Sequence, residues 1–164
     1  MKEVHIPVCV LLPFIDASLP DIEADRDKLH QVFLNLVRNA SEACPADGRV
    51  RVLTRHCAHW ELAGTNLVPT RRYILVSIED EGPGIPEELR KNIFKPLFST
   101  KKQGTGLGLS ISFRLVESHG GQLRYQPSER SGACFQVILP ESQSEPLEEN
   151  SPNFVYQDLR KEIS

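Results

Sequence analysis

The sequence has no long hydrophobic run, because its apolar stretches stay well below the roughly 18 residues that a membrane-spanning helix requires. Residues 1–16, MKEVHIPVCVLLPFID, also lack the layout of a secretory signal, since Glu3, His5 and Pro7 interrupt them and no small-residue cleavage site follows. The four cysteines include no C-x-x-C pair, and without an export signal they are expected to be reduced, mostly buried thiols. These absences predict a cytoplasmic protein without direct membrane contact.

The sequence also lacks a basic stripe. Its net charge is −3, and residues 141–164 hold six acidic and two basic residues, which leaves 17 basic and 16 acidic residues for 1–140. A nearly neutral body of this kind predicts no nucleic-acid partner. With 40% hydrophobic residues, the 164-residue chain is long enough to bury one core, so residues 1–140 are expected to form a single domain.

Residues 141–164 form an acidic tail. Its first half, ESQSEPLEENSP, has few apolar residues and is predicted to be disordered. The Ser-Pro pair at 151–152 then has the pattern of an N-cap followed by a first helical residue, and apolar residues recur with helical spacing at Val155, Leu159 and Ile163. The tail is therefore either a frayed terminus or carries a short C-terminal helix.

What the chain does contain is an alternation of predicted elements. Strands are expected at 4–12, 19–25, 49–57, 71–80, 121–127 and 133–140, and helices at 27–43, 86–94 and 107–120. Asp25 or Asp27 is the expected N-cap of the first helix. Strands alternating with helices in this order predict an α/β two-layer sandwich, with the helices packed on one face of a mixed sheet.

The first predicted helix carries Asn35 and Asn39 four residues apart, on one face, with Glu42 a turn further on. Asparagine is a mediocre helix former, because its side chain competes for backbone hydrogen bonds. A solvated polar face explains the pair in the simplest way. The functional alternative is a row of amide oxygens directed at a hard cation such as Mg²⁺, which prefers oxygen ligands and shares them with phosphates.

The strand predicted at 71–80 runs directly into Asp80, followed by Gly82 and Gly84. An acidic turn after a strand is a common feature with no further function. The functional alternative is that the Asp80 carboxylate accepts a hydrogen bond from the exocyclic amine of adenine, while the glycines let a flat ligand approach the backbone.

Residues 99–111, STKKQGTGLGLSI, place Gly104, Gly106 and Gly108 at alternate positions before a predicted helix. The stretch is not a Walker A loop, since Leu109 and Ser110 stand where lysine and serine or threonine are required. It is not the dinucleotide fingerprint either, because that pattern needs glycine at position 109.

Glycines that lead into a helix leave its N-terminal N–H groups uncovered, and such groups bind anions. Lys101 and Lys102, just upstream, can add positive charge beside phosphates. A flexible linker is disfavoured, because Leu107 and Leu109 alternate with the glycines. The stretch therefore predicts a phosphate site.

In their order and spacing, four motifs resemble the N, G1, F and G2 boxes of the ATP-binding catalytic domain of sensor histidine kinases. They are NLVRNA at 35–40, DEGPGI at 80–85, FKPLF at 94–98 and GTGLGL at 104–109. This domain is one branch of the ATPase superfamily shared with gyrase, Hsp90 and MutL. The amino-acid sequence of the motifs is most similar to that of the nitrogen-regulation class. The resemblance covers residues 4–140 and implies the Bergerat ATP-binding fold, with a mostly antiparallel sheet.

The resemblance implies ATP and Mg²⁺ as cofactors and assigns the roles. Asn39 is the implied Mg²⁺ ligand, assisted by Asn35, and Asp80 the implied adenine acceptor. Residues 94–104 correspond to a mobile ATP lid, and the glycines after it to a phosphate cradle. The positions implied to contact ATP are Asn39, Asp80, Gly82, Gly84, Ile85, Phe94, Phe98, Thr100, Lys101, Lys102, Gly104, Thr105, Gly106, Leu107, Gly108 and Leu109.

Asn35 decides the reaction class. In the gyrase and Hsp90 branch a glutamate at this position activates water, and an amide cannot act as a general base. The resemblance therefore implies an ATP-dependent protein histidine kinase, which transfers the γ-phosphate to histidine in a two-component system. Two alternatives remain: a gyrase-like ATPase, and a non-catalytic module that binds nucleotide to regulate a partner.

The phospho-acceptor is not recognisable in the sequence. None of the five histidines lies in a long amphipathic helix with an acidic neighbour, as the family's acceptor does; they are His5, His30, His56, His59 and His119. The implied partners are therefore the dimerisation and phospho-acceptor domain of the same kinase and the receiver domain of a response regulator. The chain by itself is expected to be a monomer.

Overall fold

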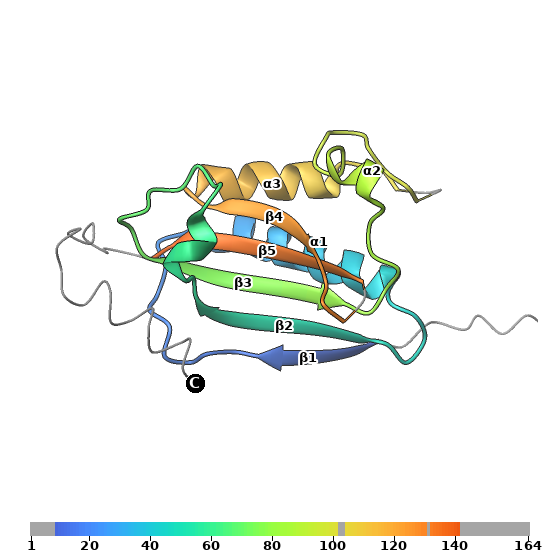
Figure 1. Ribbon diagram of the computed structural model, residues 1–164, viewed down its shortest axis with the longest axis horizontal. Coiled ribbons are helices and arrows are strands. Elements are labelled where there is room, and N and C mark those ends of the chain that lie inside the picture. Colours follow the sequence, from blue (N-terminus) through green and yellow to red (C-terminus); the bar gives the residue numbers. More distant parts are fainter. Residues whose placement is uncertain (1–8, 102–103, 131, 142–164) are drawn as a thin grey trace, which may run out of the picture.

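The computed structural model describes residues 9–101, 104–130 and 132–141. Two helices, α1 (Arg26–Ala43) and α3 (Gly108–Ser118), pack on one face of a five-stranded sheet, as Figure 1 shows. The strands are β1 (Val10–Phe14), β2 (Arg49–His56), β3 (Tyr73–Asp80), β4 (Gln122–Pro127) and β5 (Ala133–Pro140). The predicted two-layer sandwich with helices on one face is confirmed.

The sheet has the order β1-β2-β3-β5-β4. β1 runs parallel to β2, and the other neighbours are antiparallel, so the sheet is mixed and mostly antiparallel as expected. β3 is central, and consecutive residues along it are buried because both faces of the sheet are covered there. Since β3 ends at Asp80, the topology places this carboxylate at the C-terminal end of the central strand, beside the end of α1.

The first helix forms largely as the sequence predicts. The Asp25 carboxylate accepts hydrogen bonds from the N–H groups of Asp27 and Lys28, both at 3.1 Å, and so caps the helix. Its apolar stripe is buried against the sheet and consists of Leu29, Val32, Leu36 and Ala40. This stripe fixes the rotation of α1 and directs the opposite, polar face away from the core.

Three predicted elements differ from the structure. Residues 19–25 were expected to be a strand but form an irregular segment, because their alternating acidic side chains remain exposed and β1 alone occupies that edge of the sheet. The expected helix at 86–94 is limited to α2 (Glu87–Arg90), followed by tight turns. The strand expected at 4–12 is observed as β1, from Val10 to Phe14, and residues 4–8 lie outside the described residues. β1 includes Pro13, which an edge position tolerates.

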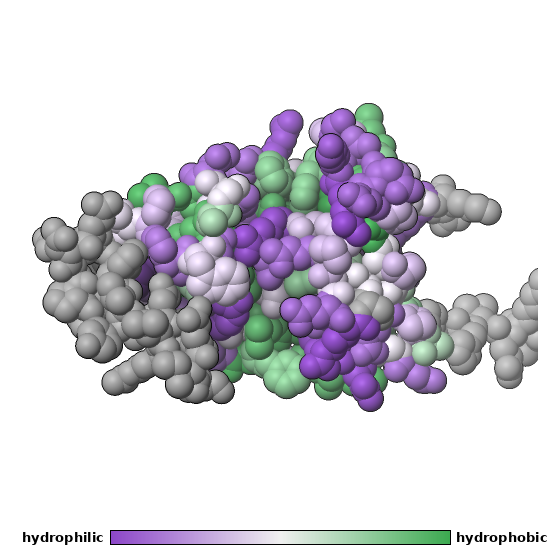
Figure 2. Space-filling model, viewed as in Figure 1, coloured by the Kyte–Doolittle hydropathy of each residue, from purple (hydrophilic) through white to green (hydrophobic). Residues whose placement is uncertain are grey.

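The loop between β2 and β3 folds onto the face of the sheet opposite the helices, through the short 3₁₀ helix η1 (His59–Leu62). There Leu62 packs with Tyr73, Leu75 and Ile138 in a second, small hydrophobic cluster. Figure 2 views this face and shows hydrophilic residues across its middle, and hydrophobic residues next to a hydrophilic patch along the lower edge.

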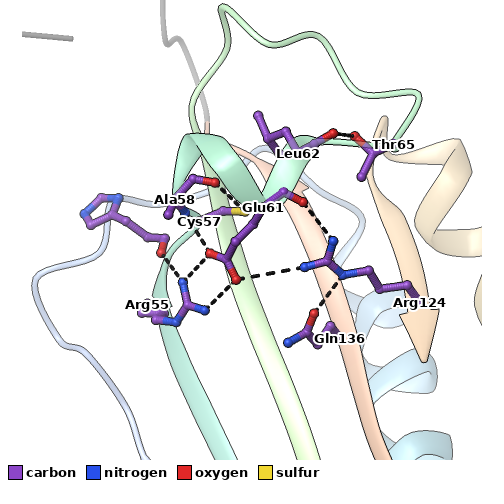
Figure 3. A network of polar contacts seen from close by, with 9 residues as sticks. Arg55, Cys57, Ala58, Glu61, Leu62, Thr65, Arg124 and Gln136 are labelled. Atoms are coloured by element: carbon purple, nitrogen blue, oxygen red, sulfur yellow. Dashed lines mark hydrogen bonds and ion pairs between the residues drawn. The ribbon is translucent and has the colours of Figure 1, made fainter. Parts of the chain in front are cut away.

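A buried carboxylate anchors the loop. Glu61, 6% exposed, accepts two hydrogen bonds from the Arg55 guanidinium, at 2.6 and 2.7 Å, and one from the Ala58 N–H at 2.9 Å (Figure 3). Arg124 of β4 donates to the Glu61 carbonyl and to Gln136 of β5. Burial raises the pKa of the Glu61 carboxyl, but the hydrogen bonds from Arg55 and Ala58 outweigh it and hold the pKa below its usual value.

The remaining expectations about the chain ends and cysteines are met only in part. Glu141, the first residue of the predicted tail, is 4% exposed, and its N–H donates to the Arg72 carbonyl. The possible helix around Val155 lies outside the described residues. All four cysteines are present as thiols, but Cys44 is the buried one and the other three are half-buried. In the part of the chain that the structure describes, no helix combines the length and apolarity needed to cross a membrane.

Candidate nucleotide site

A cleft of about 700 Å³ opens between α1, the end of β3 and the segment from α2 to the start of α3. This volume lies within the range of small-molecule sites. Thirteen predicted site residues line it: Asn35, Asn39, Asp80, Gly84, Ile85, Phe98, Thr100, Lys101, Gly104, Thr105, Gly106, Gly108 and Leu109. The structure therefore brings residues from three distant parts of the sequence around one cavity.

Asp80 lies on the floor of this cleft and is 2% exposed. Its Oδ1 atom accepts hydrogen bonds from the N–H groups of Gly82, at 2.8 Å, and Ala133, at 3.2 Å. None of the described residues donates to its Oδ2 atom. Burial raises the pKa of the Asp80 carboxyl, although the two N–H groups oppose this shift. The side chain is thus held rigidly and keeps an acceptor for a ligand.

The polar face of α1 forms one wall of the cleft. The Lys101 ammonium donates to the Asn39 amide oxygen at 3.3 Å and pairs with the Glu42 carboxylate. The hydrogen bond from Lys101 lowers the pKa of Glu42, and Arg38 contributes to the same shift. Asn39 therefore presents its oxygen to a positive charge, and the resulting oxygen donor set of Asn39 and Glu42 fits a hard cation.

Asn35 connects the two helices. Its amide nitrogen donates to the Ser112 hydroxyl of α3 at 2.9 Å. A Cβ atom at Gly108 would lie 2.5 Å from the Asn35 Oδ1 atom, so only glycine permits this approach of α3 to α1. Asn35 thus holds the start of α3 against the cleft, and its part in cation binding remains a prediction.

The glycine-rich segment is held in a specific conformation. Gly106 has φ +68°, and a Cβ atom there would lie 2.5 Å from the Leu97 carbonyl carbon. Leu107 follows as the N-cap residue of α3, and no side chain caps the helix. The first N–H groups of α3 therefore remain available at the cleft, where the helix dipole favours an anion.

Aromatic packing anchors the base of this segment. The Phe94 ring lies 5.2 Å from that of Phe113 on α3 and 6.4 Å from that of Phe135 on β5. Phe98 packs partly buried against the same core and lines the cleft. The two phenylalanines expected to hold the lid thus both contact the body of the domain.

Three predicted residues do not line the cleft. Gly82 donates its N–H to Asp80, Phe94 packs against the core, and Leu107 occupies the N-cap position of α3. Lys102 lies outside the described residues. The lining also includes residues that were not among the predicted contacts: Arg38, Glu42, Ala43, Pro83, Pro86, Leu89, Ile93, Ser99, Ala133 and Phe135. Most of these are apolar side chains of the core edge, which no local pattern distinguishes from the rest of the core.

A sandwich of this topology, with a buried carboxylate below a cleft and an uncapped glycine-rich helix start at its rim, defines a nucleotide-binding class of ATPase folds. Residues 24–143 match the family described as histidine kinase-, DNA gyrase B-, and HSP90-like ATPases, and the chain belongs to this family. The resemblance inferred from the four motifs is confirmed.

The sensory histidine kinase/phosphatase NtrB of Azospirillum brasilense is 40% identical over 127 residues, which are 76% of this chain and 32% of that protein. The catalytic domain of histidine kinase ThkA superposes with a TM-score of 0.65 at 32% identity, covering 81% of this chain and 80% of that one. A structure of ThkA in complex with response regulator protein TrrA gives 0.61 at 30% identity, covering 82% and 34%. The chain thus spans about a third of the NtrB relative.

Proposed function

We propose that this chain is the ATP-binding catalytic domain of a sensor histidine kinase of the nitrogen-regulation class. It binds ATP with Mg²⁺ and transfers the γ-phosphate to a histidine of a dimerisation and phospho-acceptor domain, from which a response regulator takes it. The observation that carries this proposal is the buried Asp80, which lines a cleft of nucleotide size and whose Oδ2 atom accepts no hydrogen bond from the described residues. The similarity to NtrB and to ThkA, solved with a response regulator, supports the partners.

Asp80 suits adenine because the exocyclic amine of the base is a donor and the carboxylate can only accept. The Gly82 and Ala133 N–H groups keep the carboxylate in place, so binding does not have to order it. Apolar side chains on both sides of the cleft, among them Ile85 and Ile93, offer surfaces for the flat base. The phosphates then reach the start of α3.

Asn39 and Glu42 are the side chains that would hold Mg²⁺, and the ion would neutralise negative charge on the phosphates. In the structure Lys101 donates to both of these side chains, so a cation bound there would displace its ammonium group. The displaced Lys101 remains within the cleft lining and can then contact phosphate.

Transfer to histidine fits the site better than hydrolysis. Hydrolysis needs a base for water, and the Asn35 side chain is an amide that already donates to Ser112. Glu42 is a carboxylate, but its pairing with Lys101 and Arg38 lowers its pKa and makes it a weak base. An imidazole acceptor is nucleophilic without such a base, so the domain acts by positioning the phosphates for in-line attack.

The proposal is tested by calorimetric titration of a non-hydrolysable ATP analogue, with and without Mg²⁺, into the chain and its Asp80→Asn variant. We expect saturable binding that strengthens with Mg²⁺ and weakens by at least about tenfold in the variant, because a charge-assisted hydrogen bond is lost. Glu79→Gln is the matched control, since this carboxylate is adjacent but bonds to Ser128 on the opposite face of the sheet.

Absence of binding to the unaltered chain contradicts the proposal. Rapid release of ADP from ATP without an acceptor favours the gyrase-like ATPase instead. Binding without phosphate transfer to an added acceptor domain favours a non-catalytic regulatory module.

A further inference from the structure

Two cysteines outside the nucleotide cleft, Cys9 and Cys44, meet on the helix-facing side of the sheet. Cys44 is the C-cap residue of α1, and Cys9 directly precedes β1. The parallel register pairs Val10 with Arg49, and the Val10 N–H donates to the Gly48 carbonyl at 3.0 Å. One residue earlier, the same register places Cys9 beside Gly48. Side chains alternate along a strand, so Cys9 shares the face of Val50, which is fully buried under α1.

Gly48 provides the space in which the two thiols meet. A Cβ atom at this position would lie 2.6 Å from the Cys44 Sγ atom, so any side chain there would expel the thiol. Cys44 is buried in the main hydrophobic core, and Cys9 packs against the same cluster. The Cys44 Sγ atom donates at 3.4 Å to the carbonyl of Arg49, the residue that follows Gly48 and begins β2. Gly48 thus lies against the Cys44 thiol on one side and, by the strand register, beside Cys9 on the other, which places the two cysteines next to each other as a disulfide requires.

We propose that Cys9 and Cys44 form a reversible disulfide when the protein meets hydrogen peroxide. The bond links the start of the edge strand to the C-terminal end of α1. Ala43, the last residue of α1 and the neighbour of Cys44, lines the nucleotide cleft. The site is a covalent modification site distinct from the cleft itself.

The two thiols have different roles in the reaction. Cys9 is half-buried and the more accessible, so its sulfur attacks the peroxide; the O–O bond breaks, one water leaves, and Cys9 becomes a sulfenic acid. The Cys44 sulfur then attacks Cys9, the S–O bond breaks, and a second water carries away the Cys44 proton. Two thiols lose two electrons and two protons, and one peroxide becomes two waters.

The other two cysteines provide an internal comparison. Cys57 donates its N–H to the Tyr73 carbonyl at one end of β3, whereas Cys134 pairs with Glu79 near the other end. Six residues along a strand separate them by about 20 Å, so they cannot bridge. Burial also raises the pKa of the Cys134 thiol, to about 11, which keeps it unreactive.

The test uses the full chain carrying Cys57→Ser and Cys134→Ser, so that the proposed pair alone remains. Treatment with hydrogen peroxide should remove two hydrogens from the intact mass, and peptide mapping should find Cys9 joined to Cys44 within one molecule. The melting temperature should rise by about 5–10 °C, because the bond closes a long loop in the unfolded chain. Dithiothreitol should reverse both changes.

The control adds Cys9→Ser to the same background, a substitution at a half-buried position that leaves the core residue Cys44 intact. It should show neither the mass loss nor the thermal shift. Oxygen added to Cys9 without a crosslink, or a crosslink between two molecules, overturns the proposal. None of these measurements involves nucleotide, so their outcome is independent of whether the chain binds ATP.

Discussion

Asp80 illustrates at the scale of one residue how function and stability oppose each other. The carboxylate is a strong acceptor for a ligand because it is buried and held by two backbone N–H groups. The same burial raises its pKa, which means that the ionised form is less stable in the folded protein than in the unfolded chain. The site therefore costs the apo protein some stability.

We predict that Asp80→Asn raises the melting temperature by a few degrees near pH 7 while it weakens nucleotide binding. An acid whose pKa is raised on folding reduces stability as the pH rises from its unfolded value of 3.8 through the folded value. The advantage of the variant, followed by calorimetric melting, should thus shrink as the pH falls through that window. A lower melting temperature at pH 7 would contradict this prediction. It would mean that the hydrogen bonds from Gly82 and Ala133 stabilise the ionised carboxylate by more than its burial costs.

The sequence predicts some of these residues better than others. Asn39 and Asp80 belong to local motifs whose spacing is informative without the fold. The contact of Lys101 with Glu42 joins residues 59 positions apart, and only the packing of α3 against α1 brings them together. Polar contacts between distant segments depend on the tertiary structure and have no periodic signal in the chain.

At the scale of elements, the segment between α2 and α3 combines rigid and open positions. Phe94 anchors its start in the core, and Gly106 turns its end into α3 with a backbone conformation that other residues rarely adopt. Between them, Leu97 is 76% exposed and also has a positive φ. An element with two fixed ends and an exposed middle can change shape around a ligand without unfolding its neighbours.

We predict that Gly106→Ala weakens binding of the ATP analogue about tenfold or more, because the new Cβ atom collides with Leu97 and forces the start of α3 away from the cleft. Gly64→Ala is the matched control, with φ +73° but nothing within 4 Å of its Cβ position. Both carry the same backbone strain, so calorimetric titration of the two variants separates strain from collision. Equal losses in both would contradict this reason.

The elements themselves were predictable where one pattern dominates. α1 has a capping aspartate and a continuous apolar stripe, and the prediction matched its bounds within one residue. Residues 19–25 have alternating hydrophobicity but no free sheet edge to join, so the pattern of a strand was misleading there. Strand pairing depends on neighbours that are remote in the sequence, whereas a helix satisfies its own backbone.

At the scale of the whole molecule, the two faces of the sheet differ in what covers them. The helices bury one face, and the η1 loop covers part of the other through the Glu61 network. Exposed apolar residues gather along the β1 edge, where Val10, Leu11, Phe14 and Ile15 are each about half exposed. This edge is the surface at which an association of copies would most readily occur.

We predict nevertheless that the chain sediments as a monomer at micromolar concentration, because the resemblance places dimerisation in the acceptor domain. Sedimentation velocity at increasing concentrations checks this expectation. A concentration-dependent dimer would contradict it, and Phe14→Glu should then disrupt the dimer if the β1 edge forms the contact.

The parallel neighbour of β1 has a consequence for the order of folding. Among the described strands, β2 to β5 join their neighbours in antiparallel pairs, whereas β1 reaches β2 only after the chain has crossed over through α1. Closing that crossover costs chain entropy before any β1–β2 hydrogen bond forms. Because β1 has one neighbouring strand and several exposed apolar residues, we predict that it is the first strand to detach when the sheet opens.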